Sequence, residues 1–176
     1  MQVLRYSMSA RLYHWLSAIL VFGLIPVGLY LGRGDPPDGP LTDTLYLLHE
    51  SFGVLLWLLV LFRLVSRQVN GVPEQPAATP PLLRLAARLN HVALYLMLLI
   101  QPVTGFLANN AGGYPLVWFN LLPIPSPVGK NDRLSDTLFS LHDIGGWLLI
   151  ALVCLHLAGA AYHGLIRRDG VVRRMA

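Results

Sequence analysis

The stretch LFSLHDIGGWLLIALVCLHLAGAAYHGLI, residues 138–166, is apolar along most of its length and carries two histidines, His142 and His156, that are 14 residues apart. An α-helix rises about 1.5 Å and turns about 100° per residue, so the two side chains lie roughly 21 Å apart along the axis and about 40° apart around it. The stretch therefore predicts one long helix that presents two imidazoles from nearly the same face at two depths.

The composition of the whole chain places this helix in a membrane. Of 176 residues, 55% are hydrophobic and 12% are charged, whereas soluble domains carry about 25% charged residues. Apolar stretches near the length of about 20 residues that crosses a bilayer occur at residues 12–31, 44–65, 89–108 and 138–166. We interpret the first as a retained helix and not a signal peptide, because no small-residue cleavage pattern is evident. The chain is therefore predicted to be an all-α membrane protein, a single domain over residues 1–176 that forms a four-helix transmembrane bundle.

The basic residues are distributed unevenly between the ends of these spans. One set of ends and connections holds ten arginines with Glu74 and Asp169 as its acids, and the other loops hold Arg33, Lys130 and Arg133 beside five aspartates. The positive-inside rule then places both termini in the cytoplasm. The arginines flank membrane spans and no nucleic-acid-binding motif accompanies them, so no nucleic acid partner is expected.

All of the histidines fall in or at the edges of the apolar stretches: His14, His49, His91, His142, His156 and His163. Ionisable residues inside a membrane are costly and usually functional, although a single one can be a hydrogen-bonded packing residue. Imidazole is an axial ligand of haem iron, and an iron with imidazole on both sides transfers electrons and does not bind substrate. The chain has one cysteine, Cys154, and no CxxCH motif, so any haem is expected to be held without a covalent bond.

The depths of the histidines predict how they pair. His49 and His142 lie five and four residues after the outer starts of their spans, so they are expected to hold one iron between them. His14 lies roughly 18 Å below His49, and His156 lies roughly 21 Å below His142, so His14 matches His156 better than it matches His163, which would lie roughly 31 Å below. His91 has the same predicted depth as His14, and depth alone leaves open which of the two faces His156.

Small residues follow the candidate ligands by three or four positions, which places them on the same helix face as the ligand. A porphyrin that lies against a helix needs such room, although packing between membrane helices also favours glycine and alanine. We interpret these positions as room for a porphyrin: Ala18, Gly53, Gly145, Gly146, Gly159 and Ala160.

The second outer loop, residues 109–136, contains three aromatic side chains, Tyr114, Trp118 and Phe119. Aromatics at this position either form an anchoring belt at the membrane interface or cover a cofactor, and the belt is the favoured interpretation. Pro26 and Pro102 fall inside the first and third spans, where each is expected to bend its helix.

The apolar stretches and their ends carry the motifs Tyr13-His14-Trp15, His49 with Gly53 and Arg63, Asn90-His91 with Tyr95, Pro102-Val103-Thr104-Gly105, Leu141-His142-Asp143, and Leu155-His156 with His163. Taken together, these motifs resemble those of the prokaryotic cytochrome b561 family, over all four spans. The resemblance implies a multi-pass protein of the bacterial inner membrane with two non-covalent haems b. It assigns His49 and His142 to the outer haem iron, and His14 and His156 to the inner one.

The same resemblance implies an activity. Members of the family exchange electrons with ubiquinone, and the best-defined activity is oxidation of superoxide to dioxygen on the outer side, with His91 and His163 helping to hold the quinone. A histidine can donate a hydrogen bond and then a proton to a quinone that is being reduced. The outer loops have an excess of two acidic residues, three basic against five acidic, which fits poorly with an anionic substrate.

Two other functions remain open from the sequence. The chain can be a membrane cytochrome b subunit that links a hydrogenase- or dehydrogenase-type redox partner to the quinone pool, although its short loops favour an enzyme that acts alone. It can also be a transporter that uses its histidines for metal ions or protons. A soluble hydrolase is not supported, because the sequence shows no nucleophile paired with a base.

Overall fold

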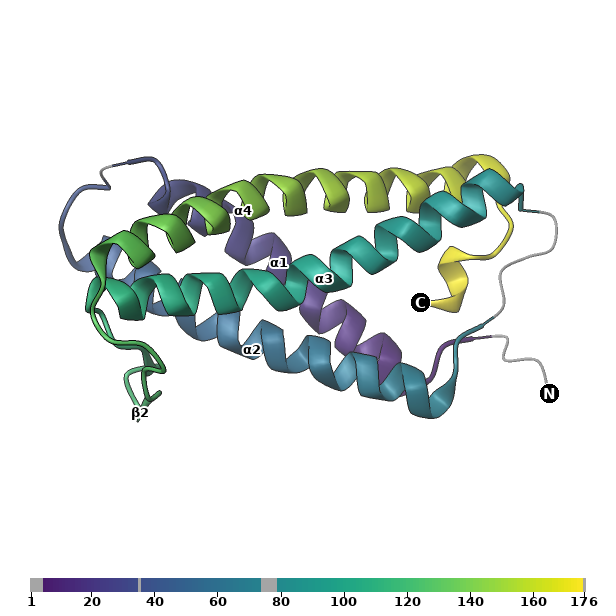
Figure 1. The fold of residues 1–176 in the computed structure, drawn as a ribbon. Coiled ribbons are helices and arrows are strands. Elements are labelled where there is room, and N and C mark those ends of the chain that lie inside the picture. The colour runs from purple at the N-terminus through teal and green to yellow at the C-terminus, as the bar shows by residue number, and fades with distance from the viewer. Residues whose placement is uncertain (1–4, 35, 74–78, 176) are drawn as a thin grey trace.

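The computed structural model describes residues 5–34, 36–73 and 79–175, and consists mainly of four long helices that run alternately up and down (Figure 1). All four are long and apolar enough to cross a membrane, which confirms the predicted all-α four-helix transmembrane bundle. Asp35 and Glu74, which enter the charge balance, lie outside the described residues. The helices are α1 (Met8–Leu31), α2 (Pro40–Asn70), α3 (Pro81–Gly112) and α4 (Asp132–Ala161). A short antiparallel hairpin of β1 (Val117–Trp118) and β2 (Leu122–Pro123) precedes α4, which continues into the π-helix η1 (Tyr162–Arg167) and the 3₁₀-helix η2 (Val172–Arg174).

The helices extend beyond most of the predicted span boundaries, because an apolar pattern marks only the part of a helix that crosses the bilayer. Ser7 and Asn131 cap the starts of α1 and α4 with side-chain oxygens that accept backbone N–H bonds. Pro40 and Pro81 stand in the first turns of α2 and α3, where a missing N–H costs nothing. Local sequence signals outside the apolar windows thus fix the helix starts.

The bundle is built from two helix pairs. α1 packs along α2 and α3 packs along α4, while α2 and α3 join the pairs and α1 and α4 are not closely packed against each other. Its buried apolar centre consists of Val21 on α1 with Leu56 and Val60 on α2. Leu56 stands seven residues after His49, so this centre lies roughly 10 Å along the axis from that histidine. An apolar layer therefore separates the two ends of the bundle.

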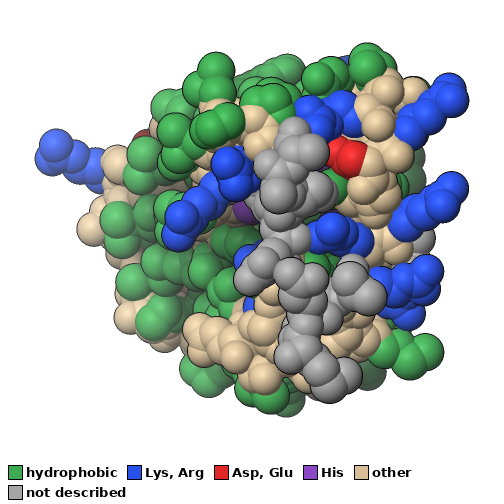
Figure 2. All heavy atoms as spheres, turned by 90° about the vertical axis from the view of Figure 1, so that its right-hand side faces the viewer, with side chains coloured by type: hydrophobic (Ala, Val, Ile, Leu, Met, Phe, Trp, Pro, Cys, Tyr) green, Lys and Arg blue, Asp and Glu red, His purple; other side chains and the backbone are tan. Residues whose placement is uncertain are grey.

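Both termini lie at the same end of the bundle (Figure 1). Seen from that end, the surface carries many arginine side chains and few acidic ones (Figure 2). The C-terminal segment folds back onto α1, where Trp15 Nε1 donates to the Met175 carbonyl oxygen at 2.9 Å. We call this basic end the inner end and the opposite end, with the β-hairpin, the outer end.

The hairpin at the outer end packs against α2. Trp118 Nε1 donates to the Ser51 carbonyl oxygen and the Phe119 backbone N–H donates to Ser51 Oγ, both at 2.9 Å. The Phe119 ring also packs edge-on against Phe52, with centroids 5.2 Å apart. The turn between the strands thus directs Trp118 and Phe119 back onto the bundle, and the interfacial belt stays a prediction. Tyr114 alone keeps the exposure, 70%, that a belt residue needs.

Candidate functional site

The outer end of the bundle brings His49 of α2 and His142 of α4 face to face. Their ring centroids are 6.2 Å apart, with the ring planes nearly perpendicular at 81°. A metal–imidazole bond is about 2 Å long, so two imidazoles on opposite sides of one iron have centroids roughly 6 Å apart. The separation of these rings therefore fits axial ligation of a haem iron, at the equal depth that the sequence predicts.

Hydrogen bonds fix the tautomer of His142. Its Nδ1 lies 3.0 Å from the Gln101 carbonyl oxygen and 3.3 Å from Thr104 Oγ1, both on α3. A carbonyl only accepts, so Nδ1 carries the proton and Nε2 keeps its lone pair for a metal, as is usual for histidines that bind metals. Pro102 follows Gln101 and removes one backbone donor from this part of α3, which bends within the bundle (Figure 1).

The partner ring has a different environment. His49 Nδ1 is buried and, among the residues that the structure describes, has no hydrogen-bond partner of good geometry. The Leu24 carbonyl oxygen of α1 lies close enough to interact with it. A buried polar nitrogen without a well-formed hydrogen bond is uncommon in folded proteins, so His49 lacks the orienting hydrogen bond that metal-binding histidines usually have and that His142 makes.

Two glycines on neighbouring helices give these imidazoles their space. A Cβ atom on Gly28 of α1 would stand 2.9 Å from His49 Cε1, and one on Gly105 of α3 would stand 3.0 Å from His142 Cε1. Real Cβ atoms essentially never approach a heavy atom within 3.0 Å, so a side chain at position 28 would force His49 to move, and one at position 105 would be packed tightly against His142. Sequence reasoning missed both, because it looked for small residues on the ligand's own helix.

The small residues that the sequence analysis selected divide into two groups. A Cβ on Gly53 or Gly159 would meet no atom within 4 Å, so open space lies beside these positions. A Cβ on Gly145 would instead collide with Gln101 and Met97 of α3. Gly145 therefore serves close packing between α3 and α4, and its interpretation as room for a porphyrin is wrong.

The inner end brings three histidines together. The rings of His14 on α1 and His156 on α4 have centroids 6.2 Å apart and planes at 78°, which is nearly the geometry of the outer pair. His91 of α3 is closer to His156, with centroids 5.4 Å apart and planes at 60°. His14 and His156 are half-buried, whereas His91 is exposed. Both candidates that depth left open thus flank His156, and His14 has the separation that matches the outer pair.

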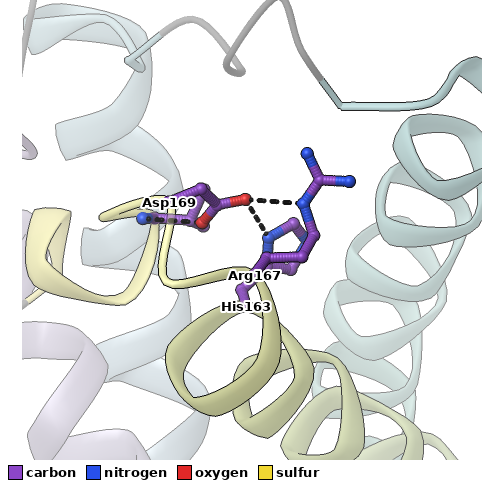
Figure 3. A network of polar contacts seen from close by, with 4 residues as sticks. His163, Arg167 and Asp169 are labelled. Atoms are coloured by element: carbon purple, nitrogen blue, oxygen red, sulfur yellow. Dashed lines mark hydrogen bonds and ion pairs between the residues drawn. The ribbon is translucent and has the colours of Figure 1, made fainter.

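His163 stands apart from these rings, in η1 at the inner end. Its Nδ1 lies 2.7 Å from Asp169 Oδ2, which also accepts from Arg167 Nε at 3.0 Å (Figure 3). Burial raises the pKa of the Asp169 carboxyl, but hydrogen bonds from His163, the Val171 N–H and Arg167 outweigh it and hold the pKa below its ordinary value. π-Helical turns are often found at functional sites. From the sequence, Asp169 entered only the charge balance, whereas in the structure it links His163 and Arg167 of this turn.

The space between the two histidine levels is apolar. A groove of about 210 Å³ between α1 and α4 is lined by residues that include Phe22, Pro26, Ile150 and Cys154. Within residues 5–34, 36–73 and 79–175, no three His, Cys, Asp or Glu side chains are grouped as a bare metal ion would need. Opposed imidazoles beside apolar space are the donor set of a haem that is bound without a covalent bond.

Comparisons with known proteins agree with this arrangement. The family model described as prokaryotic cytochrome b561 matches residues 5–176. The chain is similar to cytochrome b561 homolog 2 of Escherichia coli (strain K12), with 32% identity over 171 residues that cover 97% of this chain and 90% of that protein. It is also similar to cytochrome b561 homolog 1 of the same organism, with 27% identity over 177 residues that cover 97% and 96% of the two chains.

Proposed function

The chain belongs to the prokaryotic cytochrome b561 family of membrane haem b proteins that transfer electrons, and we propose that it oxidises superoxide at the outer side of the bacterial inner membrane and reduces ubiquinone at the inner side. The basic inner end, which holds both termini, then faces the cytoplasm. The observation that carries the proposal is the presence of two imidazole pairs with the same 6.2 Å separation, one at each end of the bundle.

We assign two haems b to these pairs, the outer to His49 and His142 and the inner to His14 and His156. Haem iron, when bound, supplies reversible one-electron chemistry. With both imidazoles of a pair bound to it, the iron would be closed to superoxide and quinone, and each would exchange electrons without binding the metal. The buried layer of Val21, Leu56 and Val60 keeps water out of the region between the two levels.

The overall reaction balances with one quinone for two superoxide anions. Each superoxide loses one electron and becomes dioxygen, and ubiquinone gains the two electrons and two protons to become ubiquinol. We assign His91 and His163 to the quinone. The exposed position of His91 and its 5.4 Å distance from His156 support this role, because a group that donates hydrogen bonds and protons must reach a ligand outside the haem site. The carboxylate of Asp169 orients His163 by accepting from Nδ1, which leaves Nε2 to interact with a quinone oxygen.

The test is a haem-quantified, reduced-minus-oxidised spectrum of the purified protein, repeated with superoxide and with superoxide plus ubiquinone. We expect two haems b per chain that superoxide reduces and ubiquinone reoxidises, with superoxide dismutase abolishing the reduction. Haems that respond to ubiquinol and not to superoxide would contradict the assigned donor. A stoichiometric iron–sulfur protein that co-purifies from native membranes would instead make the chain a subunit of a larger complex.

A further inference from the structure

Arg63 of α2 repeats the spacing of the histidines on α4. It follows His49 by 14 residues, as His156 follows His142. By the same helical geometry it lies roughly 21 Å from His49 and on nearly the same face. Arg63 therefore stands at the inner end, at the level of His156, on the side of α2 that faces the histidines. Consistent with this placement, it is an electrostatic neighbour of His14, His91 and His156.

A second arginine, Arg67, shares an aromatic partner with Arg63. The guanidinium carbons of Arg63 and Arg67 lie 5.4 and 5.2 Å from the ring centroid of Tyr95 on α3. Arg67 Nη1 also donates to the Tyr95 hydroxyl oxygen at 3.2 Å. Contacts of this kind hold a guanidinium in place. We call these three residues the Arg63–Arg67–Tyr95 cluster.

The cluster has positive charge and, among the described residues, no acidic partner. Both arginines are half-buried, and within the described part of the chain neither forms an ion pair with a carboxylate. Like charges four residues apart on a helix repel each other, and charges taken from water are stabilised by a partner of opposite sign. Arginine pairs best with carboxylate and phosphate groups, which it binds through two hydrogen bonds. The arrangement is therefore that of an anion site.

We propose that the Arg63–Arg67–Tyr95 cluster binds the propionate carboxylates of the inner haem and that Arg63 raises the reduction potential of that haem. The proposal rests on the proposed function, because it requires the inner haem. It names Arg63 and Arg67 as the positive charges beside that haem. A cation beside the iron favours the ferrous state, which carries one electron more than the ferric state. A phospholipid phosphate is also an anion that arginine can bind, and the experiment distinguishes it from the haem propionates.

The test is reconstitution of the full-length apoprotein, expressed under haem deficiency, with haem b or with its dimethyl ester, in which both propionates are neutral. Wild type, Arg63→Gln and Arg63→Lys are compared, with Arg84→Gln as a control for loss of an exposed inner-end arginine. The inner site is followed as the haem that survives His142→Ala. Readouts are the affinity for each porphyrin and the midpoint potential.

We expect Arg63→Gln to weaken binding of haem b at the inner site about tenfold and to have little effect on binding of the ester, since the pair is then already broken. The midpoint potential should fall by an amount that corresponds to a tenfold change in the reduction equilibrium, about 59 mV for one electron. Arg63→Lys should retain most of the potential, and Arg84→Gln should change neither quantity.

Equal effects of Arg63→Gln on both porphyrins would overturn the proposal and indicate a lipid phosphate as the anion. That outcome needs no superoxide or quinone, so it is distinguishable from failure of the proposed function. Because wild type alone can be compared with the two porphyrins, the proposal is tested even if Arg63→Gln does not fold: equal affinity of wild type for both would contradict it.

Discussion

The two ends of the bundle hold their histidines in different ways. At the outer end, shape defines the site: one imidazole pair fits against Gly28 and Gly105, and the Gln101 carbonyl fixes one ring. At the inner end, three imidazoles meet and charge dominates, through Arg63 and Arg67. The described glycines place no comparable Cβ contact on an inner histidine. Close packing thus positions the outer ligands, while cations distinguish the inner site.

This difference predicts a direction for electron transfer. An acidic residue, Asp143, directly follows the outer histidine His142 in the sequence, whereas the inner histidines have Arg63 as an electrostatic neighbour. A unit charge about 10 Å from an iron changes its reduction free energy by roughly 1–2 kcal/mol at an effective dielectric constant near 20. Because positive charge favours the reduced state, we expect the inner haem to have the higher potential, and electrons to move inward.

The largest effect that separates the two ends is expected for His142→Ala. Loss of one axial imidazole should remove the outer haem and leave the inner one, which halves the haem content per chain. Haem quantification and the b-type absorbance of the purified variant measure the change. Full occupancy of both haems in His142→Ala would refute its assignment as a ligand and end the comparison between the sites.

Two substitutions at the inner end test which histidine binds the inner iron. His14→Ala should remove the inner haem. His91→Ala should retain both haems and slow reoxidation by ubiquinone at least tenfold, somewhat less than the full effect of removing a general acid–base catalyst, which is about 100-fold or more. Haem content and stopped-flow reoxidation are measured for both variants. The opposite result, with loss of haem only in His91→Ala, would make the closer ring the ligand of the inner iron.

A smaller effect is expected where shape defines the outer site. Gly28→Ala places a methyl group 2.9 Å from His49 Cε1, so the ring must move. The outer haem should then bind about 10–100-fold more weakly, as for other disturbances of ligand position. Gly23→Ala on the same helix is the matched control, since its Cβ would meet no atom within 4 Å. Equal haem affinity in the two variants would show that packing does not position His49.

The smallest effect concerns the inner end and pH. The pKa of Asp169 is depressed in the folded protein, so its hydrogen bonds stabilise the C-terminal turn above the ordinary pKa of about 3.9 and are lost as pH falls through the lower folded value. Trp15, which donates to Met175, should report release of the segment by a fluorescence change below about pH 4. In Asp169→Asn the change should be absent. An unaltered transition in that variant would assign it to another group.

Helical periodicity explains why much of this arrangement could be predicted. The rise and turn of a helix are fixed, so the spacing of His142 and His156 determines two levels before any packing is known. The same spacing between His49 and Arg63 was available in the sequence and could have placed that arginine at the inner site. The apolar windows likewise indicated where the four helices lie.

Contacts between elements could not be predicted in the same way. Gly28 and Gly105 act on histidines of other helices, so their role depends on which helices are neighbours. Trp118 packs on α2 because the hairpin turn, with positive φ at Phe119 and Asn120, folds back onto the bundle. Asp169 meets His163 only after the last helix widens into a π-helix. Each depends on tertiary geometry that a periodic pattern does not contain.

The most direct test of a shape-defined outer site and a charge-defined inner site is a potentiometric titration of wild type and His142→Ala, with haem counted per chain. We predict two haems b with separate midpoint potentials in wild type, and loss of the lower-potential component in His142→Ala. One haem per chain, or loss of the higher-potential component, would contradict the assignment of two haems and the inward direction of electron transfer.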